Sequence, residues 1–408
     1  MTEAEARGIL ERFGSFADQF ADCFGRRVQC TAASQYLEGL VNDSERKSMQ
    51  AMHGRLSDPI SYQALQHFVT HAPWEAAPVW DRLRTIVPER VGVLAVDDTG
   101  LPKQGRHSVA VKRQYCGALG KTGNCQVAVS SLLIGADLVW PLSCELYVPR
   151  EWIDDAPRRA KVGLPDRVRF REKWRIALAH VRAVLAAGFQ VTAVVADADY
   201  GSTAPFRRGL ERLGLRYAVA LRSDVKVQYA GMRRTVGLTA AAIPARQWRR
   251  IGWGRGTKGP LAARFVALRV RLTGTPGERW LLCERSLATA ERKYYLLNLD
   301  ATARLRTLVR LARSRWPIEQ QYRELKDDLG WDHFEGRTYR GWTHHTVLTA
   351  VAFTFLQLER RRVPQAPRPT LPTVRLWVRE IMGVLYIIST PRLMNLLTSF
   401  QRNPPLRR

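Results

Sequence analysis

The stretch Val91-Gly-Val-Leu-Ala-Val-Asp97-Asp-Thr-Gly100 decides the fold class of this chain. It is a short apolar run, typical of a buried strand, and it stops abruptly at acids and turn-forming residues. The pattern returns at Gln190-Val-Thr-Ala-Val-Val-Ala-Asp197, where a second apolar run again meets an acid. Two buried strands that both end in carboxylates predict an α/β sheet with acidic groups at one edge.

The segments around these two runs predict further strands and helices. Three short β segments joined by tight turns follow the first run and indicate an antiparallel start to the sheet, at 108–115, 126–134 and 138–148. A helix at 166–187 leads into the second run, and a helix at 205–213 leads into a strand at 217–221. Because strand, helix and strand in succession favour parallel pairing, the sheet is predicted to be mixed.

A third carboxylate stands in the late stretch Arg315-Trp-Pro-Ile-Glu319-Gln-Gln-Tyr-Arg-Glu-Leu-Lys326. Glu319 and Lys326 are two helical turns apart, so both project from nearly the same side of a helix. Pro317 suits the first helical position, and the helix is predicted to begin or kink there. The residues predicted to share one face are Glu319, Tyr322, Arg323 and Lys326. A solvated, salt-bridged helix face would have the same composition.

The charge balance predicts a polyanionic partner. Lys and Arg number 64 against 37 acids, a net charge of +27 with a pI near 10.6. Nucleic acid is the leading partner and an anionic membrane surface the weaker one. The six cysteines form no Cys-x-x-Cys pair, which argues against a zinc ribbon or a disulfide framework and indicates a reducing environment. The longest apolar run, 347–358, is too short to span a bilayer, so we expect a soluble protein.

Shifts in composition divide the chain into five regions. They are a helical N-terminal domain at 1–88 (possible DNA-end binding), the first part of an α/β core at 89–222, a β-rich insertion at 223–292, the second part of the core with the third acid at 293–345, and a helical region at 346–408 (possible dimerisation). The Gly-rich stretch 252–259 is predicted to be a loop inside the insertion.

The order of these elements is similar to that of the ribonuclease H-like fold. Asp97, Asp197 and Glu319 occupy the places where that fold holds three carboxylates, at the ends of two strands and on a late helix. Carboxylates on rigid supports could hold two Mg²⁺ ions for phosphodiester chemistry. Taken singly, each acid could be a turn residue or a surface charge. Three together in a strongly basic chain favour the catalytic interpretation.

The chain resembles the DDE transposases of bacterial insertion sequences, in the branch with the signature Tyr-x2-Arg-x3-Glu-x6-Lys known as insertion-sequence family seven-oh-one. Arg315, Glu319 and Lys326 match that signature at its spacings. Stretches at 96–105, 114–124, 196–201 and 329–337 are also similar, so the resemblance covers roughly 90–350. Two positions depart from it: Ala312 replaces the signature tyrosine, and Asp199 replaces a glycine two residues after Asp197.

The resemblance implies cutting of transposon ends and joining of their 3′-hydroxyls to target DNA, with two Mg²⁺ ions or Mn²⁺ in their place. It implies a homodimer on transposon-end and target DNA, in the bacterial cytoplasm at the nucleoid. Phosphate contacts are expected from Arg315, Tyr322, Arg323, Lys326, Lys103, Lys121 and Arg337. The branch also stacks a flipped base on a tryptophan of its β insertion, which suggests Trp253 or Trp280. From the sequence alone, core or loop aromatics are the favoured interpretation of both.

Two alternatives remain open from the sequence. One is a ribonuclease H-like nuclease that cuts DNA without joining it. The other is a transposon-derived DNA-binding protein whose catalytic site has decayed, which Ala312 faintly favours and the three acids oppose. His333, His344 and His345 lack matching Cys or His partners, so they are predicted to be structural or to face phosphates.

Overall fold

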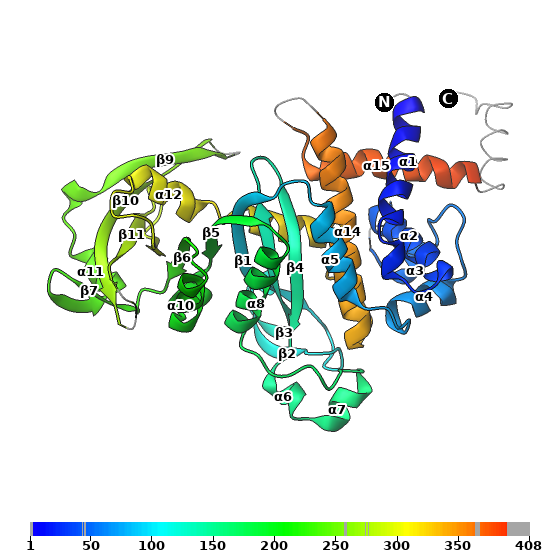
Figure 1. The fold of residues 1–408 in the computed structure, drawn as a ribbon, viewed down its shortest axis with the longest axis horizontal. Coiled ribbons are helices and arrows are strands. Elements are labelled where there is room, and N and C mark those ends of the chain that lie inside the picture. The colour runs from blue at the N-terminus through cyan, green and yellow to red at the C-terminus, as the bar shows by residue number, and fades with distance from the viewer. Residues whose placement is uncertain are drawn as a thin grey trace, which may run out of the picture.

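The computed structural model describes residues 3–42, 44, 46–256, 259–273, 275, 277–363 and 368–389. Its described strands form one twelve-stranded mixed sheet, with helices near both ends of the chain (Figure 1). The strands that surround the acids are β1 (Val91–Pro102), β2 (Lys112–Cys116), β3 (Lys121–Ile134), β4 (Val139–Tyr147), β5 (Gln190–Ala196) and β6 (Tyr217–Leu221). The prediction of a mixed α/β sheet is confirmed.

Strand β1 is the centre of this part of the sheet. It pairs parallel with β5 on one side, up to Val96 opposite Ala196, and β5 pairs parallel with β6. On its other side β1 pairs antiparallel with β3, with Asp97 opposite Ser130 and Pro102 opposite Cys125. The predicted turn at 97–100 is therefore wrong: β3 continues to bond the backbone of β1 for six residues past Val96.

The sheet continues beyond β6. Strand β12 pairs antiparallel with β6, and the order then runs β11, β10, β7 and β8. Strand β9 pairs with the first half of β10, and β7 pairs with its last residues. These strands are β7 (Lys226–Tyr229), β8 (Met232–Thr235), β9 (Arg249–Gly256), β10 (Gly259–Leu272), β11 (Arg279–Arg285) and β12 (Arg292–Leu297). The Gly-rich loop predicted at 252–259 is wrong for 252–256, because these residues complete β9 and pair with β10.

Three helices and an extended segment cover the sheet near the acids. The helices are α8 (Lys173–Ala186), α9 (Ala198–Ser202) and α10 (Ala204–Arg212). The helix predicted at 166–187 begins seven residues late. Residues before Lys173 alternate between cationic and apolar side chains, and this period of two suits an extended backbone. Phe170 of this segment packs edge-on against Tyr147 of β4 at 6.3 Å.

The helical ends of the chain pack together at one end of the molecule, in blue and in orange to red in Figure 1. They are α1 (Glu3–Asp18), α2 (Arg27–Val41), α3 (Met49–His53), α4 (Tyr62–Thr70), α5 (Ala76–Ile86), α14 (Tyr339–Arg362) and α15 (Leu371–Ser389). Arg12 of α1 donates to Glu359 of α14, and Phe13 and Phe16 pack against Phe355 at 5.1 and 5.4 Å. Within the described part of the chain, no helix has the length and hydropathy needed to cross a membrane.

Helix α14 is buried along most of its length, as the apolar run at 347–358 predicts. Its two adjacent histidines act as structural links. Both ring nitrogens of His344 lie beside carbonyl oxygens, of Val69 at 2.9 Å and Trp74 at 2.8 Å. His345 contacts the Tyr36 hydroxyl at 2.8 Å through Nδ1 and the Trp331 carbonyl at 3.1 Å through Nε2.

Candidate active site

Two of the three predicted acids leave neighbouring strands at the same level. Val96 of β1 lies opposite Ala196 of β5, so Asp97 and Asp197 follow the last pair of the parallel ladder. Asp97 is buried, with only 10% of its side chain exposed. Asp197 caps helix α9, because its Oδ1 accepts the backbone N–H groups of Asp199 at 3.0 Å and Tyr200 at 3.2 Å.

The surroundings of this pair disfavour two negative charges. Burial raises the pKa of the Asp97 carboxyl; Arg315 opposes the rise, and the charges of Asp197 and Asp98 add to it. Burial also raises the pKa of Asp197, against the hydrogen bond from Tyr200. Two desolvated carboxylates that repel each other can both be ionised only if a cation lies near them.

The third predicted acid, Glu319, is linked to Asp97 through an arginine. It lies in the first turn of α13 (Pro317–Arg323), which begins at Pro317 as predicted. Arg315, in the turn between α12 (Leu305–Arg313) and α13, donates from Nη1 to Asp97 and from Nη2 to Glu319. Its guanidinium therefore lies between two of the predicted metal ligands. Within the described residues, no group of three or more His, Cys, Asp or Glu is placed to hold a metal ion.

The donor chemistry nevertheless fits a hard divalent cation. Carboxylate oxygens are the ligands that Mg²⁺ prefers, and it needs few of them from the protein. The repulsion between Asp97 and Asp197 identifies a place where positive charge is stabilising. The Glu319 side chain is half exposed and pairs with Arg315.

The late helix changes its winding after Arg323. Helix α13 passes into a π-helical turn, η4 (Glu324–Asp328), a feature often found at functional sites. Lys326 lies in this turn and donates to Thr99 Oγ1 at 2.8 Å and the Gly100 carbonyl at 3.0 Å, so it ties η4 to β1. Glu324, the next acid along, is buried and accepts from Gln320 at 2.9 Å.

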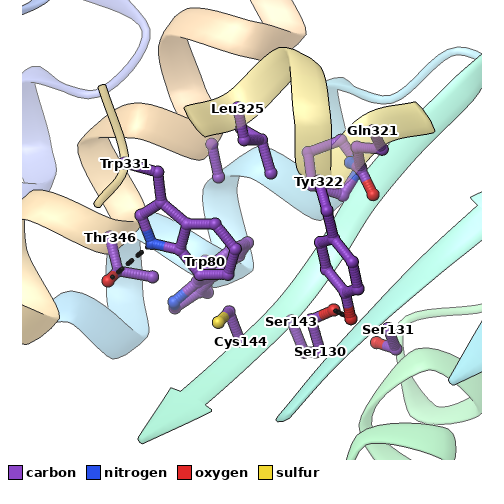
Figure 2. A pocket seen from close by; sticks show the side chains of 12 residues that line it. Trp80, Ser130, Ser131, Ser143, Cys144, Gln321, Tyr322, Leu325, Trp331 and Thr346 are labelled. Carbon is purple, nitrogen blue, oxygen red and sulfur yellow. Dashed lines mark hydrogen bonds between the residues drawn. The ribbon is translucent and has the colours of Figure 1, made fainter. Parts of the chain in front are cut away.

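The helical spacing predicted that Tyr322 and Arg323 share a face, but Tyr322 is buried whereas Arg323 is exposed. The Tyr322 hydroxyl lies in the interior, 2.7 Å from Ser130 Oγ on β3 (Figure 2). A cavity of about 20 Å³ beside it has room for one water molecule. Ser131 Oγ and Gln321 Nε2 line this cavity and have no hydrogen-bond partner within the described residues.

The other predicted DNA-contacting cations have different surroundings. Lys103 donates to the carbonyls of Asp332 at 3.3 Å and Phe334 at 2.6 Å, and burial lowers its pKa to about 8. This lysine therefore holds the loop after η4. Lys121 and Arg337 are exposed and make no contact with the three acids in the structure.

The two tryptophans predicted to stack on a base already contact other groups. Arg313 lies over the Trp253 ring at 4.3 Å, and Arg269 lies over the Trp280 ring at 4.8 Å. The sequence pattern did not single out Trp316 as a tryptophan available for stacking. It adjoins Arg315, and its side chain is 60% exposed. Its position directly before the proline that begins α13 was the available signal, because a residue there lies outside the regular helix.

Asp98 is a second acid that the sequence did not separate from its neighbour. Since successive residues of a strand point to opposite faces, it lies across β1 from Asp97. Its Oδ2 accepts from Lys173 Nζ at 2.8 Å and from the Tyr200 hydroxyl at 3.1 Å. Lys173 and Tyr200 thus link α8 and α9 to the strand that carries Asp97. By contrast Asp199 is exposed, 3.7 Å from Arg222.

Comparisons with known proteins identify the family of this chain. The profile of the DDE superfamily endonucleases matches residues 19–260, more than half of the chain, and that of the transposase DDE domain matches residues 172–355. The chain is 27% identical over 345 residues to the probable transposase for insertion sequence element IS701 of Microchaete diplosiphon, covering 81% of this chain and 82% of that protein. The chain therefore belongs to the DDE superfamily of endonucleases and is a DDE transposase of the insertion-sequence kind.

Proposed function

We propose that this transposase cuts DNA at the ends of its element and joins the freed 3′-hydroxyls to target DNA, with Asp97, Asp197 and Glu319 as its metal ligands. The observation that carries the proposal is the exit of Asp97 and Asp197 from adjacent parallel strands, with Glu319 linked to Asp97 through Arg315. Rigid strands hold two carboxylates in place, and a helix brings the third.

We assign the architecture to the ribonuclease H-like class. Support comes from the sheet order, in which β3 lies antiparallel beside β1 while β1, β5 and β6 run parallel. In this assignment 89–222 and 293–345 form the catalytic core and 223–292 is an insertion that extends its sheet. The helical regions 1–88 and 346–408 flank it, of which 390–408 lies outside the described residues.

Two Mg²⁺ ions, or Mn²⁺ in their place, would be held by Asp97, Asp197 and Glu319, and when bound they activate the attacking water or 3′-hydroxyl and stabilise the leaving oxygen. The protein positions these ligands through the hydrogen bonds of Asp98 and Lys326. Arg315 would move from the carboxylates to a DNA phosphate, beside the exposed Arg323.

Cleavage of end-bearing DNA in Mg²⁺ tests the assignment of the acids. We expect Asp97→Ala, Asp197→Ala and Glu319→Gln to bind DNA like the wild type and to lose at least about 100-fold in cleavage rate, since each removes a metal ligand. Asp199→Ala is the matched control and keeps its activity. Cleavage that persists in Glu319→Gln would move the third ligand to Glu324.

A second measurement separates joining from cutting alone. An end that is already cut, with a free 3′-hydroxyl, should yield a joined product with target DNA if the chain is a complete transposase. A nuclease would cut the uncut end without joining it, and a decayed DNA-binding protein would do neither. Because both ends must be cut together, we expect a homodimer on DNA, measurable as the mass of the end complex.

A further inference from the structure

A second charged cavity lies away from the three acids, on the flank of the sheet. It measures about 690 Å³ and is bounded by α5, β4, the extended segment before α8 and the start of α14. Helix α5 lies between β4 and α14 in Figure 1. We call it the arginine groove, after the lining residues Arg84, Arg167, Arg169, Arg171 and Arg340.

The arginine groove has an excess of positive charge. Two glutamates line it beside the five arginines: Glu75 pairs with Arg167 at 2.9 Å, and Glu145 pairs with Arg171. Arg169 is exposed and has no ion pair or hydrogen bond to any residue that the structure describes. The Arg167 side chain is 68% exposed even with its partner. Positive charge is therefore left facing solvent.

The row of cations in the segment before α8 continues from the groove to strand β1. Arg167, Arg169, Arg171 and Lys173 occupy every second position of the chain. The intervening Phe170 anchors this segment, with its ring between Tyr147 and the guanidinium of Arg150. Because Lys173 pairs with Asp98, the row of cations leads from the arginine groove to β1, on the face of that strand opposite Asp97.

A buried histidine supplies an independent sign of a ligand. His180 of α8 lines the groove and is 7% exposed, and its Nδ1 has no hydrogen-bond partner within the described residues. Burial lowers the pKa of His180 to about 3, so the ring is neutral. A buried polar atom without a partner costs free energy, unless a ligand or water completes its hydrogen bond.

The alternative is that the arginines only attach the surrounding helices and the extended segment to the sheet. This explains Arg84, which is buried and donates to the Leu142 carbonyl at 2.8 Å. It does not explain Arg169. Nor does it account for Arg340, which is exposed and uses Nη1 for the His71 carbonyl at 2.7 Å.

We propose that the arginine groove binds the phosphodiester backbone of DNA, with Arg167, Arg169 and Arg340 as its phosphate contacts. The inference rests on the proposed function only in taking DNA as the substrate. Phosphate contacts of this kind hold a duplex in register without reading its sequence. The backbone could belong to the element's end or to the target, because both present the same chemistry.

The test compares two triple variants with equal loss of charge. One combines Arg167→Ala, Arg169→Ala and Arg340→Ala. The control combines Arg182→Ala, Arg212→Ala and Arg234→Ala, at exposed positions outside the groove. Binding of a duplex that carries the terminal repeat is measured by fluorescence anisotropy over a range of salt concentrations. Joining of a pre-cut end to an unrelated duplex is measured over a range of target concentrations, and melting curves confirm that both proteins are folded.

We expect the groove variant alone to lose affinity, with the slope of log K against log salt smaller by about 0.9 for each phosphate that the variant no longer neutralises. If the groove variant binds the terminal-repeat duplex more weakly, the groove contacts the element's end. If instead joining requires a higher concentration of target duplex, the groove contacts the target. Equal effects in both variants, or none in either arm, overturn the proposal. When DNA is saturating, we expect the groove variant to cleave at the wild-type rate. A failure of the catalytic proposal would appear in a different measurement, as absence of cleavage by the wild-type protein.

Discussion

Arg315 neutralises the carboxylates of the candidate active site in this structure. Its guanidinium joins Asp97 to Glu319 while a quarter of its own side chain is exposed. It supplies, from within the protein, the positive charge that the buried carboxylates require. A divalent cation and this arginine would compete for the same oxygens.

Replacing Arg315 by Gln should destabilise the metal-free protein and increase the stabilisation that the protein gains from bound metal. Removing one partner of a largely buried ion pair costs about 3 kcal/mol, because the remaining carboxylate stays desolvated. We expect a lower melting temperature in chelator and a larger rise with Mn²⁺ than in the wild type. Arg323→Gln, at an exposed position on α13, is the control. Identical melting of Arg315→Gln and wild type in both conditions would refute the competition.

Tyr322 and Ser130 should behave as one unit in stability. Their hydroxyls are 2.7 Å apart in the interior, and a hydrogen bond there contributes about 1 kcal/mol. We expect Tyr322→Phe and Ser130→Ala each to lower the free energy of unfolding by about that amount and the double variant to lose little more. Cleavage should fall while DNA affinity stays, because the bond positions the helix of Glu319.

Additive losses in this double-mutant cycle would mean that the two hydroxyls do not cooperate. Tyr115→Phe, at a tyrosine 69% exposed, controls for the loss of a phenolic hydroxyl. A drop in DNA affinity for Tyr322→Phe would instead restore the DNA contact that the sequence predicted for this tyrosine.

At the scale of elements, the contact between α9 and β6 determines where Asp197 lies. Gly201 of α9 packs so closely on β6 that an added Cβ would lie 1.8 Å from the Ala220 carbonyl oxygen. Only glycine permits this approach of helix to strand. Since Asp197 caps α9, the position of the helix also orients its carboxylate.

Gly201→Ala should therefore displace α9 and its capping acid together. Overpacking of this kind costs about 1–3 kcal/mol. We expect a lower midpoint of urea unfolding and a cleavage rate reduced more than DNA affinity. In the control Gly105→Ala, the new methyl group would meet no atom within 4 Å. Unchanged cleavage in a folded Gly201→Ala protein would show that α9 does not position Asp197.

At the scale of the whole molecule, His345 joins the N-terminal helices to the loop after η4. Its Nδ1 can accept from the Tyr36 hydroxyl while Nε2–H donates to the carbonyls of Gly330 and Trp331, an arrangement that suits the neutral ring. Burial lowers the pKa of His345 from 6.5 to about 4, and nearby Lys103 also lowers it. The N-terminal helices, α14 and the loop after η4 are thus held by one uncharged imidazole.

Acid should weaken this junction. Between pH 6.5 and 4 the unfolded chain binds a proton at His345 that the folded protein does not, so the stabilisation is complete above pH 6.5 and is lost as the pH falls through this range. The free energy of unfolding is lower by about 2 kcal/mol at pH 5 because of this histidine. Urea unfolding at pH 7 and pH 5 should show a smaller difference for His345→Gln than for the wild type. His107→Gln, at an exposed histidine, should match the wild type, and equal losses in all three proteins would contradict the assignment.

Local patterns in the sequence determined most of the elements around the acids. The apolar runs before Asp97 and Asp197 identified two central strands, and Pro317 located the start of the late helix. Matching stretches in order identified the transposase family. These features depend on the period of apolar residues and on the backbone limits of proline, which act between near neighbours in the chain.

Contacts between distant segments determined the rest, and only the tertiary structure shows them. Asp97 lies within β1 because β3 continues to pair with that strand, and Tyr322 turns inward because Ser130 lies beside it. Arg315 pairs with a carboxylate 218 positions away, and the arginine groove joins residues from 74 to 344. A sequence pattern records the type of a side chain and its local period, whereas its partners are set by packing across the sheet, where burial and charge act through space.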